Sequence, residues 1–109
     1  MSGRITTPSF YVCEEMKKLR EGLTKRGIEW NDMTQYGPPG HEELWICRTK
    51  FEYHGNKWSV IHGFGTYGGF SHFMHDCGKL ELLIVGTYGE PIGRLTAAEV
   101  FKLMDKEGE

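Results

Sequence analysis

The sequence has no long hydrophobic segment. Its longest apolar run, Leu82–Val85, is far shorter than the ~20 residues that a helix needs to cross a bilayer. The amino-terminal stretch MSGRITTPSF also lacks the apolar core of a secretory signal peptide. We therefore expect a soluble, cytoplasmic protein with no membrane partner.

The sequence also lacks a large excess of positive or of negative charge. Thirteen Lys and Arg residues stand against 15 Asp and Glu, which gives a formal net charge of −2 at pH 7 and a pI near 6.2. Affinity for phosphate backbones without sequence preference requires a basic surface. The composition therefore argues against non-specific nucleic-acid binding.

Cysteine is scarce, and the spacing of the cysteines indicates no disulfide or metal-binding framework. Cys13, Cys47 and Cys77 are an odd number, and they match neither a disulfide scaffold nor a CxxC zinc site. We predict three reduced thiols and no disulfide.

Enough apolar material is present for one hydrophobic core. Of the 109 residues, 39% are hydrophobic and 13% are aromatic, which fits a single domain over residues 1–109. Apolar residues recur every three or four positions from Val12 to Leu23 and predict one face of a helix. Thr7 is expected to cap its start with Pro8 at the first helical position, and Gly27 to follow its end.

The middle of the chain is typical of antiparallel strands. After a short strand at 28–30 and a loop over 32–40, two β-prone runs, 44–53 and 57–62, flank the turn-forming cluster His54-Gly55-Asn56 and predict a β-hairpin. Across this hairpin we expect Trp45 to face Trp58. The nearly continuous apolar run Leu80–Val85 predicts an inner strand.

The carboxy-terminal region carries a capping box. Thr96 and Glu99 have its spacing, with Leu95 and Val100 as the flanking apolar pair, so a second helix should begin near Ala97. The order of elements predicts an α+β fold: a small antiparallel sheet with an N-terminal and a C-terminal helix packed on it.

The segment from Gly63 to Gly69 has the densest functional signal. It places four glycines in seven residues and fits GxGxxG, but the βαβ unit of a dinucleotide fold is missing. Glycines allow successive N–H groups to point into one concavity that binds anions, and an aromatic side chain nearby can stack on a base. The alternative is a purely structural connection in which the aromatic residues cover the core edge.

The binding interpretation also needs cations to hold phosphate oxygens. Four lie on the strands or turns that flank the glycine segment: Arg48, Lys50, Lys57 and Arg94. The predicted ligand-binding set is His62, Gly63, Phe64, Gly65, Thr66, Tyr67, Gly68, Gly69, Arg48 and Arg94.

A metal site is the other chemical possibility. His72, His75 and Cys77, with His62 or Asp76, have donor types that suit zinc, and such a centre would make the protein a small metal-dependent hydrolase. No second motif of recognised spacing accompanies them, and Cys77 has no base that the sequence identifies. We therefore predict no catalytic residue, no metal and no cofactor, with this set as the alternative.

The strings VIHGFGTYGG and PIGRLTAAEV resemble small accessory proteins of tailed bacteriophages, mainly over residues 60–100. The resemblance implies a protein of the host cytoplasm that counters host defence by sequestering a nucleotide-type signal, as a homo-oligomer. It also implies the alternative of an inhibitor that binds a defence enzyme, as anti-CRISPR proteins do.

Overall fold

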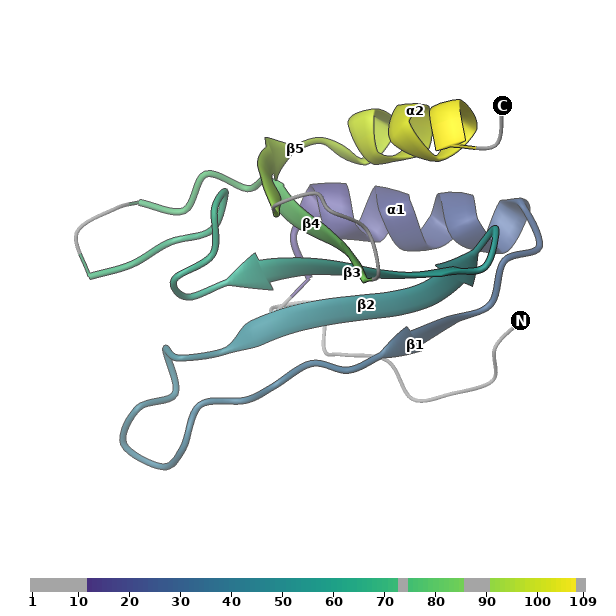
Figure 1. The fold of residues 1–109 in the computed structure, drawn as a ribbon. Helices are drawn as coiled ribbons and strands as arrows, with labels where there is room; N and C mark the ends of the chain where they lie inside the picture. The colour runs from purple at the N-terminus through teal and green to yellow at the C-terminus, as the bar shows by residue number, and fades with distance from the viewer. Residues whose placement is uncertain (1–11, 73–74, 86–90, 108–109) are drawn as a thin grey trace.

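The computed structural model describes residues 12–72, 75–85 and 91–107 (Figure 1). Within them, five antiparallel strands form one sheet in chain order: β1 (Trp30–Asp32), β2 (Ile46–Tyr53), β3 (Asn56–Gly63), β4 (Leu80–Val85) and β5 (Ile92–Leu95). The helices α1 (Glu14–Lys25) and α2 (Ala97–Glu107) lie on the same side of it (Figure 1). The predicted α+β class is confirmed. Neither of these helices is long and apolar enough to cross a membrane.

The core lies between the helices and one face of the sheet, which we call the covered face. Alternate side chains of β2 and β3 are buried on it, because successive residues of a strand point to opposite sides. The helices contribute the other half of the core through Met16, Leu19, Leu23, Val100 and Met104. No described element packs on the opposite, uncovered face.

The predicted hairpin is confirmed, but the predicted tryptophan pair is wrong. Tyr53 pairs with Asn56 across a two-residue turn, His54-Gly55, in which both residues have positive φ. This turn sets the register and places Trp58 opposite Phe51, with ring centroids 5.8 Å apart. Trp45 lies beyond the strand and packs on Phe70 instead.

The end of α1 and the start of α2 agree with the sequence. Gly27 follows α1 with φ 75°, as expected of a residue in the left-handed conformation. Thr96 N donates to Glu99 Oε1 (2.8 Å), and Glu99 N donates to Thr96 Oγ1 (3.2 Å), so the capping box before α2 is formed. The predicted start of α1 is wrong, because the helix begins later in the chain.

Helix α1 begins at Glu14, with Cys13 as an extended N-cap residue. The apolar series reaches back to Val12 because that side chain also packs on the core, although it precedes the helix. Thr7 and Pro8 lie outside the described residues. Strand β5 was not predicted, because its four residues include Arg94 at φ 56° and are too irregular to show a period of two.

A buried arginine attaches α1 to the sheet. Arg20 is 6% exposed, and its Nε donates to Thr49 Oγ1 at 2.7 Å. A terminal nitrogen of the same guanidinium lies 3.4 Å from Asp32 Oδ1, and both side chains are 7% exposed. The guanidinium carbon also lies 4.8 Å from the centre of the Trp30 ring. One side chain therefore connects α1 to both β1 and β2.

We expect Arg20→Ala to lower the free energy of unfolding by about 3–5 kcal/mol, because it leaves the buried Asp32 carboxylate without its cation. Urea denaturation measures the loss. Lys17→Ala is the matched control, since Lys17 lies on the same helix and its 3.6 Å contact with Glu14 is exposed, so the loss should stay below about 1 kcal/mol. Equal losses for the two variants would contradict the role assigned to Arg20.

Candidate functional site

The glycine segment is a compact connection held together by its own hydrogen bonds. Thr66 Oγ1 accepts from Gly63 N (3.1 Å) and donates to Gly63 O (2.9 Å). Gly65 N donates a hydrogen bond to Phe70 O at 2.8 Å, and Phe70 N donates one to Gly63 O at 3.2 Å. The segment thus folds back on the end of β3.

Most N–H groups of the segment already donate hydrogen bonds within the chain. This holds for residues 63–67, 69 and 70, whose acceptors include Trp45 O for Phe64 and Glu81 Oε1 for Tyr67. An anion bound by these groups would have to replace existing hydrogen bonds. The geometry therefore favours the structural interpretation of the glycines.

Three of these glycines are required by close packing, and at Gly63 a Cβ would overlap the carbonyl oxygen of Trp45. Gly68 has φ 113°, and a Cβ there would lie 2.9 Å from the carbonyl carbon of Lys79. At Gly69 a Cβ would overlap the carbonyl oxygen of Gly63. Gly65 has φ 77° but no other atom within 4 Å of the Cβ position. Backbone contact, and not ligand contact, accounts for Gly63, Gly68 and Gly69.

The aromatic residues of the predicted set divide into a packed one and an exposed one. Phe64 makes edge contacts with Phe70 and His72, at centroid distances of 6.0 and 5.0 Å. Tyr67 is 64% exposed, and its carbonyl accepts the N–H of Arg94 at 3.1 Å. The structure therefore brings Arg94 to the glycine segment, as the sequence suggested.

Arg48 lies elsewhere, on the uncovered face of β2 opposite Ile61. Its Nε is buried and has no hydrogen-bond partner within the described ranges. No ion pair or hydrogen bond there joins its side chain to the glycine segment. Arg48 is thus a cation of the sheet face.

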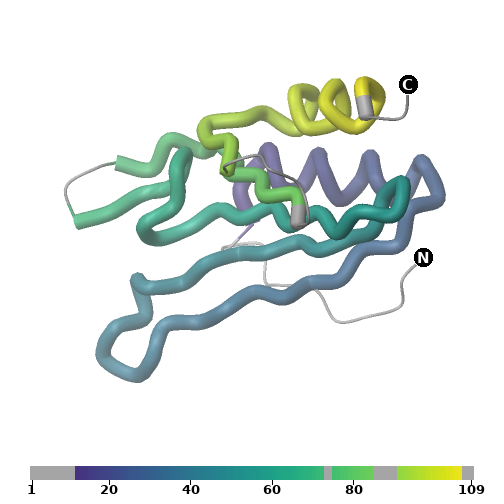
Figure 2. Tube along the Cα trace, viewed as in Figure 1, coloured from purple at the N-terminus to yellow at the C-terminus, as the bar shows by residue number. Residues whose placement is uncertain are grey.

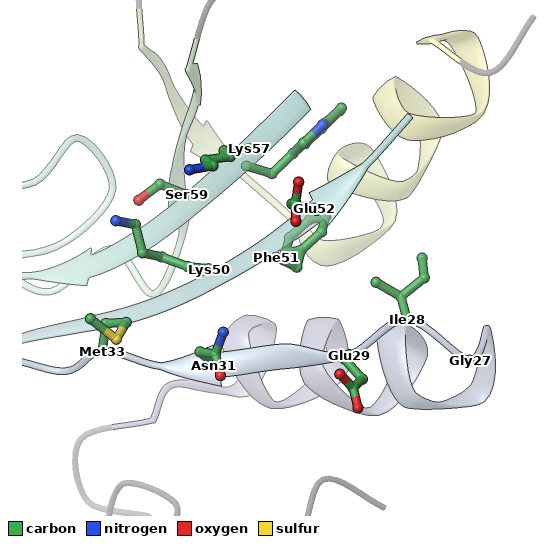
Figure 3. Close-up of a pocket in the computed structure, with 11 residues that line it drawn as sticks. Gly27, Ile28, Glu29, Asn31, Met33, Lys50, Phe51, Glu52, Lys57 and Ser59 are labelled. Carbon is green, nitrogen blue, oxygen red and sulfur yellow. The ribbon is translucent and has the colours of Figure 1, made fainter. Parts of the chain in front are cut away.

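The sheet face also carries a groove of about 760 Å³, which runs over β1, β2 and β3 (Figure 3). Its polar lining side chains are Glu29, Asn31, Lys50, Glu52, Lys57 and Ser59, and Ile28 and Met33 add apolar surface. Lys50 and Lys57 belonged to the four cations considered from the sequence. The groove itself was not predicted, because it depends on which face the helices leave open.

The two lysines of the groove have no counter-ion in the part of the chain that the structure describes. Lys50 pairs in register with Ser59, and Lys57 pairs with Glu52, so all four side chains lie on one face of two adjacent strands. Figure 3 shows them projecting from β2 and β3. Among the described residues, neither Lys50 Nζ nor Lys57 Nζ comes within 4.0 Å of a carboxylate oxygen, although Glu52 is the direct neighbour of Lys57.

His62 occupies the covered face and is fully buried. Its Nδ1 lies 2.7 Å from the carbonyl oxygen of Lys79, and its Nε2 lies 3.2 Å from Asp76 Oδ1. Burial alone lowers the pKa of His62, but a side-chain hydrogen-bonding contact with Cys13, the Lys79 carbonyl and the charges of Cys13 and Asp76 outweigh it and raise the pKa to about 9. A protonated imidazole therefore lies inside the protein at neutral pH.

Cys13 has a place in the structure that its spacing in the sequence does not indicate. It is half-buried at the N-cap of α1, and no side chain caps the first turn of that helix. Its side chain packs against the hydrophobic core.

The alternative metal set is not assembled. Within residues 12–72, 75–85 and 91–107, no three His, Cys, Asp or Glu side chains are grouped to hold a metal ion. His62 is buried, whereas His72, His75 and Cys77 are exposed. All three cysteines are free, in agreement with the predicted reduced thiols.

We predict that Gly68→Ala destabilises the fold more than Gly65→Ala does. Both substitutions place a side chain at positive φ, which costs about 1 kcal/mol or more, but only the one at position 68 also presses on the Lys79 backbone. Thermal melts of the two variants compare the losses. If Gly65→Ala were the more damaging change, the packing argument would be wrong.

The stability of the protein should fall as the pH rises from 6.5 to 9. Because folding raises the pKa of His62 from 6.5 to about 9, the folded state favours the imidazolium. The resulting stabilisation is fully present below pH 6.5 and is lost as the pH passes 9, by at most about 3 kcal/mol. Urea denaturation at pH 6 and 9.5 measures this change. His62→Asn should remove it, and an unchanged pH dependence in that variant would contradict the prediction.

No family model matches this sequence, and no curated protein or solved structure is significantly similar to it. The assignment of function therefore depends on the geometry and chemistry of the groove.

Proposed function

We propose that the protein is a non-enzymatic binding protein that sequesters a small nucleotide-type ligand in the groove on the uncovered face. The observation that carries the proposal is the pair Lys50 and Lys57, two ammonium groups that line a 760 Å³ groove and have no counter-ion among the described residues. Cations that lack an internal partner are available to an anion from outside.

The size and chemistry of the groove support this ligand class. Its volume lies within the roughly 300–1,000 Å³ of small-molecule sites. Lys50, Lys57 and Ser59 offer donors to phosphate oxygens, while the carboxylates of Glu29 and Glu52 can accept from ribose hydroxyls or a base amino group. Such a ligand needs donors and acceptors together, and the groove has both.

The groove replaces the glycine segment as the proposed binding surface, because the N–H groups of that segment already donate within the chain. Arg48 lies next to Lys50 along the same face of β2, and its Nε has no hydrogen-bond partner among the described residues, so this face carries a third cation. The resemblance to phage accessory proteins suggests the ligand's role: a cyclic nucleotide or ADP-ribose-derived defence signal that is held without being converted.

A thermal-shift screen against cyclic dinucleotides and ADP-ribose derivatives should return a ligand that raises the melting temperature. Calorimetry should then show about tenfold weaker binding for Lys50→Gln and for Lys57→Gln, since each loses one charge-assisted contact of about 1.5 kcal/mol. Lys18→Gln, an exposed change on α1, serves as the control and should bind normally. A screen without any stabilising compound would count against the proposal, as would equal affinities in all three variants.

A second candidate, an inhibitor that binds another protein, is favoured by exposed apolar side chains on the same face. Met33, which follows the edge strand β1, is 50% exposed, and Leu83 on the inner strand β4 is 40% exposed. Leu83 lies outside the groove, so Leu83→Glu should abolish a protein interaction and leave nucleotide binding intact. If instead Lys50→Gln abolishes binding and Leu83→Glu leaves it intact, the partner is the small ligand.

A further inference from the structure

A second groove, of about 460 Å³, lies where β5 meets α2. We call it the β5–α2 groove. Its apolar lining residues are Ile92 and Leu95 from β5 and Leu103 from α2. Ile92 is 42% exposed, so this apolar surface is open to solvent. Figure 1 shows α2 directly after β5, at the same border of the molecule.

We propose that the β5–α2 groove is the contact surface of a homodimer, in which α2 of one copy packs antiparallel to α2 of the other. The residues that line it are separate from those that line the groove on the uncovered face. The dimer and the ligand site are therefore independent, and either proposal can fail while the other stands.

The charges of the β5–α2 groove complement a second copy of the same surface. Glu99 and Lys106 both line it, and their separation of seven residues is about two turns of α2, on the same side of the helix. An antiparallel pairing about a two-fold axis midway between them places Glu99 of each copy beside Lys106 of the other. The axis then passes beside Leu103, so two ion pairs flank an apolar centre.

Both charged groups are available for this contact. The capping box uses only Oε1 of Glu99, which leaves Oε2 open to a cation. Lys106 is exposed, and in the ranges that the structure describes no carboxylate oxygen lies within 4.0 Å of its Nζ. The other acid of the groove, Asp105, is already held by Arg26 at 2.9 Å. The free acid and the free base are thus the two that the two-fold axis brings together.

The shape of β5 argues against a partner that adds a strand. It is an edge strand, but its pairing with β4 shifts register between Leu80 and Leu82, and Arg94 has φ 56°. An irregular edge does not offer the regular row of N–H and C=O groups that a further strand needs. The partner therefore contacts this border through side chains, as a helix does.

The length of α2 sets the strength of the association. Its 11 residues span about 16 Å, and a pair of such short helices buries less than the roughly 1,200 Å² of a stable interface. The dimer should consequently form reversibly and dissociate on dilution.

Sedimentation equilibrium of the full chain, from micromolar to millimolar concentration, tests the proposal. The mass should rise from 12.5 kDa towards twice that value. Lys106→Glu should weaken the association at least about tenfold, because two carboxylates then meet at each charged contact. Lys50→Glu makes the same change of charge on the uncovered face, so this control should associate like the natural chain.

A mixture of two variants identifies the pairing itself. Glu99→Lys and Lys106→Glu each place like charges at both contacts, so neither should dimerise alone. In an equimolar mixture both contacts join opposite charges, and heterodimers should form with about the natural affinity. Thermal melts establish that each variant is folded.

A natural chain that stays monomeric over the whole concentration range overturns the proposal. So does a dimer that Lys106→Glu and Lys50→Glu affect equally, since another surface would then hold it. Because Lys106 is exposed, this comparison decides the matter even if Glu99→Lys, which alters the capping box, unfolds. Two folded variants that stay apart when mixed would reject the antiparallel pairing of α2.

Discussion

The buried ion pair between Arg20 and Asp32 fixes the arrangement on which the other features depend. It crosses from α1 to β1, and the same guanidinium donates to Thr49 on β2. A charged group with this little exposure is tolerated only with its partners in place, so the helix has one favourable position on the sheet. That position decides where the start of α1 lies, and with it where Cys13 packs against the core.

The division of the sheet into a covered and an uncovered face separates two kinds of chemistry. On the covered face, low exposure strengthens electrostatic interactions, and His62 lies there with its Nδ1 on the Lys79 carbonyl and its Nε2 3.2 Å from Asp76 Oδ1. On the uncovered face, Lys50 and Lys57 remain open to solvent and to an anion. Figure 2 shows the arrangement that separates the two faces of the sheet. Both helices stay on one side, and the β1–β2 and β3–β4 connections project from one end.

The glycine segment shows how a functional motif and a structural one look alike in sequence. Small residues are needed wherever two backbones approach closely, whether the neighbour is a phosphate or another part of the chain. Here the neighbours are the Lys79 backbone at Gly68 and the Gly63 carbonyl at Gly69. The same close packing places the Lys79 carbonyl against His62 Nδ1, so the glycines help to position this histidine.

The sequence alone determined the features that depend on neighbours within a few positions. The apolar face of α1, the two-residue turn at His54-Gly55 and the capping box of Thr96 and Glu99 are local, so their patterns were sufficient to predict the α+β fold. The tertiary structure alone decided the pairing of Trp58 with Phe51, the irregular strand β5, the groove and the contacts of the buried His62. These depend on strand register and on which face the helices cover, which are set by the packing of distant segments and leave no periodic signal in the chain.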